Sequence, residues 1–215
     1  MSDSDVLTRL QSALGERVCV DADALDACRT DRSGTVAPGR PIAIVNARSV
    51  EDVQATMRIA SETGTPVVTR GAGTGLAGGG VAGSGEIVLS TLQMSEILEI
   101  SPDNLLCVVQ PGILNGELNA ALAAHNMWWA PDPASKDIST VGGNIAMNAG
   151  GLLCAKYGVT REAVLALKVV LANGELLEVG HRTVKGVTGY DLCALMIGSE
   201  AVSYTHLTLP TIYSV

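Results

Sequence analysis

Aromatic residues and long apolar runs are scarce in this sequence. Aromatic side chains account for 3% of the 215 residues, and phenylalanine is absent. No apolar stretch reaches the roughly 20 residues that a membrane-spanning helix requires. The segment MSDSDVLTRL at the start is polar and acidic, without the basic-then-apolar order of a secretory signal peptide. We therefore expect a soluble, cytoplasmic protein with no membrane span.

Positive charge and metal-ligand spacings are also lacking. The chain has 14 Lys and Arg against 22 Asp and Glu, a formal net charge of -8. This balance argues against a nucleic-acid partner, because phosphate binding needs clustered basic residues. The 5 cysteines form no CxxC pair and the 3 histidines form no HxH or HxxxH pair. We expect free thiols and no metal site.

The first part of the chain predicts helices and parallel strands. Val6, Leu10 and Leu14 stand at helical spacing, so residues 1–35 are expected to form a helical lead-in followed by a connector. Residues 41–45 and 66–69 are short branched-apolar runs that predict strands. Ser49 caps a helix between them, and Gly64 with Pro66 ends it. This β-α-β order implies parallel pairing.

The later part of the chain favours antiparallel pairing. Residues 86–89 and 105–109 predict further strands, and residues 114–122 a helix. Residues 163–171 and 175–179 flank Asn173-Gly174, a strong hairpin signal because both turn residues are expected to adopt positive φ. Parallel pairing early and antiparallel pairing late predict an α+β protein of two subdomains.

A glycine-rich stretch, RGAGTGLAGGG at residues 70–80, directly follows a predicted strand. A backbone without β-carbons can approach a ligand and aim successive N–H donors at it, as a pyrophosphate requires, and Arg70 could balance its charge. The alternative is an idle surface loop. GTGLAG matches the dinucleotide pattern GxGxxG, but no helix opens within it, which excludes a Rossmann site. A Walker loop is excluded because no Gly-Lys-Ser/Thr ending follows.

A second cluster runs from PDPAS at residues 131–135 through STVGGN to AMNAGG at residues 146–151. Ser139 and Thr140 are good caps for a short helix over residues 143–148, so we expect free N–H groups there. Such a helix start could bind an anion or a polar ring edge. The alternative is a polar turn between core elements. Two glycine-lined donor clusters favour a large ligand with a central phosphate bridge.

These motifs, together with KGVTGYDLCALMIGSE, carry a resemblance over residues 41–200. The sequence resembles the FAD-binding, PCMH-type domain of the vanillyl-alcohol oxidase and p-cresol methylhydroxylase superfamily. Within it, the branch of glycolate oxidase and the D-lactate and D-2-hydroxyglutarate dehydrogenases matches best. The resemblance implies a small parallel β-α-β subdomain and a larger, mostly antiparallel sheet with flanking helices. It places the domain at residues 36–200, with subdomains at about 36–95 and 96–200.

FAD is the cofactor that the resemblance implies, held between the subdomains. The residues implied to bind it are Arg70, Gly71, Ala72, Gly73, Thr74, Gly75, Leu76, Gly78, Gly79, Pro131, Asp132, Ser139, Thr140, Gly142, Gly143, Asn148 and Glu200. Members with covalent flavin carry a histidine where this sequence has Thr74, so non-covalent FAD is expected.

The reaction implied is hydride transfer from the α-carbon of a small 2-hydroxy acid of D configuration to flavin N5, giving a 2-oxo acid. In the family a carboxyl-terminal cap domain binds the substrate. This sequence lacks it, so no catalytic residue is nominated. A partner redox subunit or electron acceptor is expected. Alternatives are a redox-neutral flavoenzyme similar to alkyl-dihydroxyacetone-phosphate synthase, a sugar-lactone oxidase, or a non-catalytic FAD-binding component of a complex.

Residues 201–215 depart from the family pattern. After Gly198-Ser199-Glu200 the family continues with glycine and a Thr-Leu-Gly run, whereas this tail holds two of the 4 tyrosines. It resembles translated sequencing-adaptor read-through, so we expect a non-native tail on a truncated fragment. The alternative is a native short strand.

Overall fold

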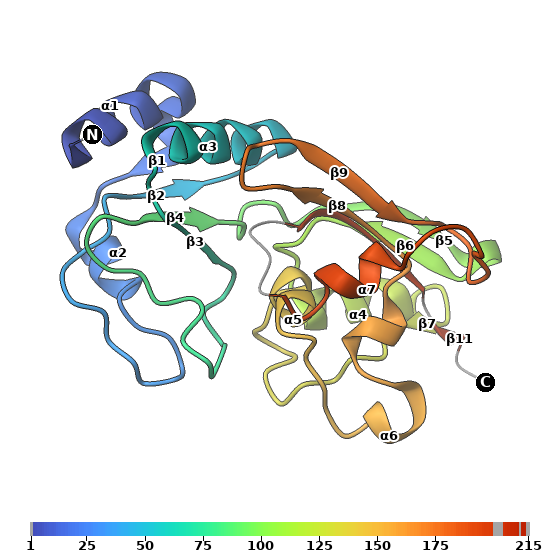
Figure 1. The fold of residues 1–215 in the computed structure, drawn as a ribbon. Coiled ribbons are helices and arrows are strands. Elements are labelled where there is room, and N and C mark those ends of the chain that lie inside the picture. Colours follow the sequence, from blue (N-terminus) through green and yellow to red (C-terminus); the bar gives the residue numbers. More distant parts are fainter. Residues whose placement is uncertain (1, 200–203, 211, 214–215) are drawn as a thin grey trace.

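Two larger β-sheets with helices packed on them, and a separate pair of short strands, make up the molecule (Figure 1). The computed structural model describes residues 2–199, 204–210 and 212–213, the last two ranges by their backbone alone. Short 3-10 turns at Gly15–Arg17, Pro102–Asn104 and Thr160–Ala163 connect longer elements. Among the residues described, no helix has both the length and the apolar character to cross a membrane.

The first sheet has four strands in the order β1-β2-β4-β3. These are β1 (Val18–Cys19), β2 (Ala43–Asn46), β4 (Ile87–Ser90) and β3 (Val67–Arg70). Strands β2 and β3 both run parallel to β4, as the predicted β-α-β unit requires, while β1 pairs antiparallel with β2. Because β4 lies between them, β2 and β3 are not neighbours.

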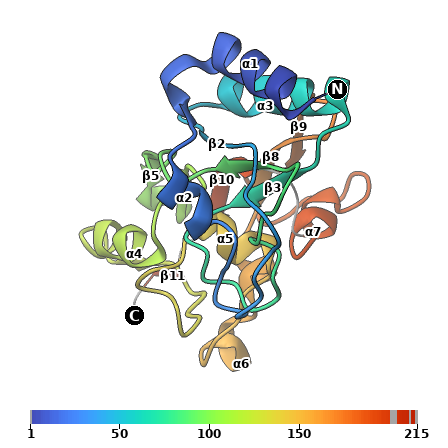
Figure 2. The same cartoon turned by 90° about the vertical axis from the view of Figure 1, so that its left-hand side faces the viewer.

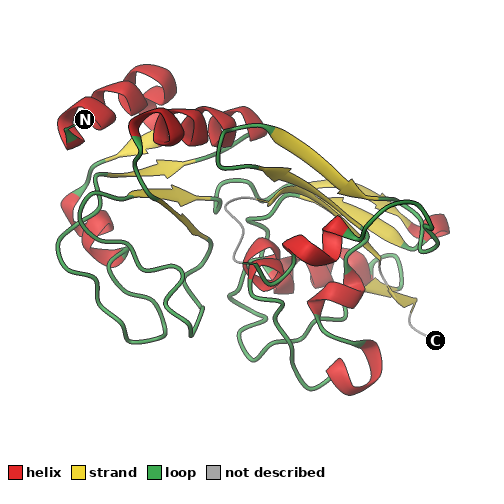
Figure 3. Cartoon of the chain, viewed as in Figure 1, coloured by secondary structure: helices red, strands yellow, loops and turns green. Residues whose placement is uncertain are grey.

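Helices α1 (Asp3–Leu14) and α3 (Val50–Thr63) cover one face of this sheet, as Figures 1 and 2 both show. Val6, Leu10 and Leu14 are buried in one core with β2, β4 and α3, which confirms the predicted leading helix. On the opposite face, a short helix, α2 (Ala22–Ala27), is followed mostly by loops (Figure 3). Within residues 2–35, β1 thus belongs to the first sheet and α1 and α2 pack on its two faces, while the predicted domain limits stay a prediction.

The capping of α3 follows the sequence prediction. The Ser49 side chain accepts a hydrogen bond from the Asp52 N–H at 3.3 Å, and Gly64 closes the helix with φ of 67°. Both signals are local, since a side-chain oxygen satisfies a free amide and glycine adopts the left-handed backbone without strain.

The second sheet has five strands in the order β5-β6-β10-β8-β9, all antiparallel to their neighbours. They are β5 (Ile97–Ser101), β6 (Leu106–Val109), β10 (Tyr204–Pro210), β8 (Ala166–Val170) and β9 (Leu176–Gly180). A separate pair joins β7 (Met127–Trp128) to β11 (Ile212–Tyr213). The predicted tail therefore contributes backbone to strands, while its non-native origin stays a prediction.

Helices pack beneath the second sheet and enclose the larger core (Figure 1). They are α4 (Asn115–Ala123), α5 (Val141–Ala146) and α7 (Leu192–Met196), whereas α6 (Cys154–Tyr157) buries no residue and lies farther from the sheet. Trp129 is 1% exposed and packs in this core with Leu118 and Ile145, so the few aromatic residues include a central packing group.

The hairpin β8–β9 forms where predicted, but its turn differs. The Leu171 N–H donates to Glu175 O at 2.8 Å, which leaves a three-residue loop. Only Gly174 has positive φ, at 81°, whereas the prediction gave it to both turn residues. That prediction was wrong for Asn173, whose side chain instead accepts from the Glu175 N–H at 3.0 Å. Loops of this length place a single left-handed residue after a type I turn.

Candidate functional site

A cavity of about 500 Å³ lies between the glycine loop after β3 and the segment around α5. This volume is within the range of small-molecule and cofactor sites. It brings together most of the predicted site residues: Arg70, Gly71, Ala72, Gly73, Thr74, Gly75, Leu76, Gly79, Thr140, Gly142, Gly143 and Asn148. Segments about 60 residues apart in the sequence thus share one hollow, although their roles as ligands stay a prediction.

The glycine loop presents backbone donors that have no partner in the protein. None of the N–H groups of residues 71–79 donates a hydrogen bond to another group in the part of the chain described. Gly73 and Gly78 have positive φ, at 65° and 83°, a conformation that other residues rarely adopt. Successive amides in such a loop form a concave anion-binding nest.

The absence of side chains lets the two clusters approach closely. A Cβ on Gly71 would overlap the Thr140 hydroxyl. A Cβ on Gly142 would lie 2.6 Å from Pro111 Cβ and 2.8 Å from Pro111 O. Gly71 therefore lets the glycine loop lie against Thr140, and Gly142 lets α5 lie against Pro111.

The first three amides of α5, at residues 141–143, all have partners, contrary to the sequence prediction. The Thr140 side chain caps the helix by accepting from the Gly143 N–H at 3.1 Å. The Val141 N–H donates to Ile113 O at 2.9 Å and the Gly142 N–H to Pro111 O at 2.8 Å. The helix also spans Val141–Ala146 rather than residues 143–148. The prediction failed because carbonyls distant in sequence take two of these amides and the Thr140 hydroxyl takes the third.

The turn after α5 is held by side chains of the second cluster. Asn148 has φ of 48°, and its Oδ1 accepts from the Arg161 N–H at 2.9 Å. The Asn144 side chain lines the cavity wall too, and its Nδ2 is buried without a partner among the described residues. Sequence reasoning omitted Asn144 from the site, although it completes the Gly-Gly-Asn motif.

The remaining predicted site residues lie elsewhere. Pro131 and Asp132 line a separate hollow of about 310 Å³, where Asp132 Oδ1 accepts from the Leu153 N–H at 3.0 Å. Ser139 is buried behind the cavity wall, and its Oγ has no partner in the part described. Gly78 belongs to the loop but does not line the cavity. Glu200 falls outside the described residues.

Only two titratable side chains line the cavity within the described residues, Asp31 and Arg70. Burial alone would raise the pKa of Asp31. Hydrogen bonds from Ser33 and the nearby Arg70 charge have the larger, opposite effect, so the pKa lies below its ordinary value of 3.8. Asp31 was not predicted, because nothing in its connector marks it as a ligand. No cluster of His, Cys, Asp or Glu suited to a metal occurs in the chain as described.

Comparison with known proteins identifies similar sequences and folds. A family model described as FAD binding domain matches residues 41–180. The glycolate oxidase subunit GlcD of Bacillus subtilis is 44% identical over 160 residues, which is 74% of this chain and 34% of that protein. D-lactate dehydrogenase of Anaerostipes hadrus is 36% identical over 210 residues, 97% of this chain and 44% of that protein. The chain thus spans less than half of these relatives.

Two solved structures share the fold. Alkyldihydroxyacetonephosphate synthase superposes with a TM-score of 0.84 at 20% identity, over 99% of this chain and 41% of that one. p-Cresol methylhydroxylase superposes with a TM-score of 0.84 at 22% identity, over 98% of this chain and 43% of that one. Both likenesses confirm the predicted α+β architecture.

Proposed function

We propose, on the premise that this chain belongs to the FAD-binding domain family of the p-cresol methylhydroxylase type, that it is the flavin-holding part of a D-2-hydroxy-acid dehydrogenase. The observation that best supports this proposal is that the N–H groups of residues 71–79, beside the cavity of about 500 Å³, have no acceptor in the described part of the chain. Relatives named as glycolate oxidase and D-lactate dehydrogenase support a small 2-hydroxy acid as substrate.

The chemistry of the residues that line the cavity fits FAD. A pyrophosphate is an anion that accepts several hydrogen bonds, and the glycine loop offers donors that nothing in the described chain accepts. Because Gly71 and Gly142 have no Cβ, the backbone of the cavity wall lies close against Thr140 and Pro111 at these two positions. We assign residues 71–79 to the pyrophosphate. Thr140, Gly142, Gly143 and Asn148 then border the space for the ribityl chain and ring.

The bound flavin is expected to be non-covalent. Thr74 lines the cavity and has no nucleophilic ring nitrogen. No histidine or cysteine side chain is among the lining residues of the described part. His125 and His181 lie outside the cavity lining as well.

Bound FAD would supply the hydride acceptor for oxidation of the hydroxy acid to a 2-oxo acid. The residues of this chain would bind and orient it. Of the two titratable residues in the cavity, Asp31 accepts the Ser33 N–H at 2.8 Å and Arg70 donates to backbone carbonyls. The lowered pKa makes the Asp31 carboxylate a weak base and the Arg70 guanidinium has no proton acceptor, so we propose that the base comes from a further domain of the enzyme.

The test is the visible absorption spectrum of the purified chain after incubation with FAD and desalting. Flavin bands that stay with the protein and leave on acid precipitation support a non-covalent site. A colourless protein that still melts cooperatively contradicts the proposal. In the full-length native enzyme, anaerobic glycolate or D-lactate should bleach the flavin, and failure of both would contradict the substrate class while leaving FAD binding intact.

A further inference from the structure

The Arg70 guanidinium is occupied by backbone carbonyls. Arg70 ends β3, and its Nη1 donates to Gly80 O at the far end of the glycine loop. Its Nη2 donates to Thr30 O at 2.9 Å and to Ala27 O at 3.4 Å. A Cβ on Gly73 would lie 3.0 Å from Arg70 Cζ, so the guanidinium packs directly against the loop.

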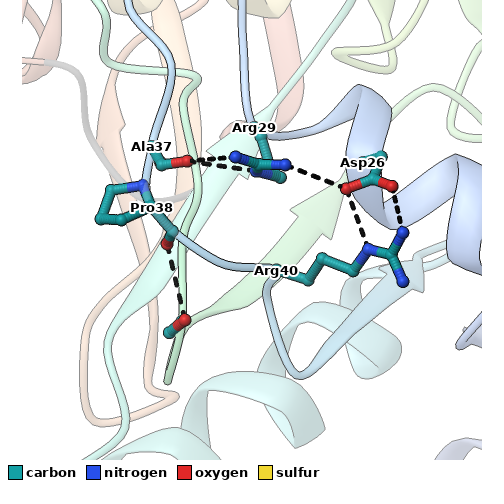
Figure 4. Close-up of polar contacts among 6 residues, drawn as sticks. Asp26, Arg29, Ala37, Pro38 and Arg40 are labelled. Atoms are coloured by element: carbon teal, nitrogen blue, oxygen red, sulfur yellow. Dashed lines mark hydrogen bonds and ion pairs between the residues drawn. The ribbon is translucent and has the colours of Figure 1, made fainter.

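Two of these carbonyls, Ala27 O and Thr30 O, belong to residues 27–38, which we name the N-terminal brace. Arg29 closes the brace by donating from Nε and Nη2 to Ala37 O at 3.1 and 3.0 Å (Figure 4). Asp26 accepts from Arg29 Nη1 at 3.2 Å and also pairs with Arg40. The brace is therefore fixed by side chains that lie away from the cavity.

Backbone hydrogen bonds join the brace to the chain that follows the glycine loop. The Ala82 N–H donates to Cys28 O at 3.0 Å, and the Ser84 N–H donates to Pro38 O at 3.2 Å. Asp31 of the brace borders the same face of Gly80 as Arg70, since a Cβ on Gly80 would lie 3.7 Å from Asp31 Oδ2. The positive charge of Arg70 thus has a carboxylate neighbour before any ligand arrives.

We propose that Arg70 is a positioning residue, which fastens the glycine loop to the N-terminal brace, and that it is not a ligand of the phosphates. A loop rich in glycine loses much backbone entropy when it is ordered. The bonds from Arg70 to Gly80 and Thr30 hold both ends of the loop before FAD binds, so its free amides stay aimed at one place. The brace lies before residue 41, outside the matched family region. The proposal rests on the FAD site proposed above.

The first experiment needs no ligand. Amide hydrogen exchange is measured in the FAD-free protein for Ala82, whose N–H reports the contact between loop and brace. Arg70→Met should speed exchange at Ala82 by about tenfold or more relative to Leu118, whose N–H is bonded within the second half of the chain. Arg182→Met, which removes an exposed arginine paired with Glu99, is the charge-matched control and should leave Ala82 unchanged. Equal exchange in both variants would overturn the proposal.

The second experiment measures FAD affinity over a range of salt concentrations. A positioning role predicts that Arg70→Met and Arg70→Lys both weaken FAD by about 10- to 100-fold with an unchanged salt dependence, because lysine lacks the planar fork of donors. A phosphate ligand predicts instead that lysine retains affinity and that methionine flattens the salt dependence. The latter result would overturn the proposal.

Arg29→Met keeps the test decisive where the Arg70 variants fail to fold. It removes the closure of the brace and leaves every cavity-lining residue in place. FAD affinity should fall in the same direction, and unchanged affinity would count against the brace. Failure of the unmodified chain to bind FAD would refute the proposed function, while exchange at Ala82 would still decide the role of Arg70.

Discussion

Gly142→Ala is the substitution whose effect the structure defines most closely. Gly142 lies in the first turn of α5, where the helix passes over the chain at Pro111. An alanine Cβ would lie 2.6 Å from Pro111 Cβ and 2.8 Å from Pro111 O. Neither atom can rotate away, because one belongs to a ring and the other to the backbone. The Gly142 N–H also donates to that same carbonyl, so a shift of α5 breaks this bond.

The magnitude follows from two opposing effects. Overpacking against rigid atoms costs about 1–3 kcal/mol, and the upper end applies where neither partner yields. Alanine recovers at most about 1 kcal/mol over glycine in a helix. The net loss in the free energy of unfolding is about 2 kcal/mol. For a chain of this size, that lowers the melting temperature by about 4–8 °C.

Thermal unfolding followed by circular dichroism measures this loss. Gly75→Ala is the matched control, because its Cβ would meet no atom within 4 Å and its φ is not positive. The control should melt like the unmodified chain, yet its methyl group projects into open space at the cavity and should weaken FAD. An unchanged or higher melting temperature for Gly142→Ala would refute the close contact with Pro111.

Three further predictions rest on single contacts. Thr140→Ala removes the cap on the Gly143 N–H and should lower the free energy of unfolding by about 1 kcal/mol in urea titration, with Thr140→Ser as the silent control. Burial raises the pKa of Cys107 and Cys193 to about 12. The stabilisation of the folded chain by its protonated thiols is therefore full below the ordinary pKa of 9.0 and is lost as pH rises toward 12. Both thiols should resist a thiol reagent at about pH 9 until urea unfolds the chain. Arginine partners lower the pKa of Asp26 to about 2, so the contribution of this carboxylate to the stability of the folded chain is lost as pH falls from 3.8 toward 2. Asp26→Asn should therefore flatten the decline of the melting temperature over that pH interval.

Elements defined by local signals could be predicted from the sequence. The cap at Ser49, the stop at Gly64 and the buried positions of α1 each depend on residues within one or two turns. Strands of two residues, such as β1 and β7, could not be predicted, since they exist only through a distant partner. The positive φ of Gly174 was predicted. The three-residue loop, in which Asn173 keeps a negative φ, depends on how the two strands pair and was not.

The site was predictable where backbone chemistry is local and not where it depends on contacts. A run of glycines after a strand signals a donor-rich loop, and within the described chain the amides of residues 71–79 are indeed free. Thr140 was correctly a cap, but the donors expected behind it are taken by Pro111 and Ile113, about 30 residues earlier. Asp31 stands about 40 residues before the glycine loop and carries no pattern of its own. It enters the cavity only because the N-terminal brace folds back over Gly80.

The charges in the cavity separate binding from chemistry. An anion would be held by backbone amides, which cannot change protonation, while Asp31 and Arg70, the only charged pair among the described lining residues, lie where each can offset the other. On the proposed function, a site built this way should bind a phosphate bridge over a wide pH range, because no group in it must gain or lose a proton for the ligand to stay. Oxidation of a hydroxy acid does require proton removal. For the proposed enzyme we therefore expect the pH dependence of turnover to report groups outside this cavity, whereas FAD affinity should stay flat from about pH 6 to 8.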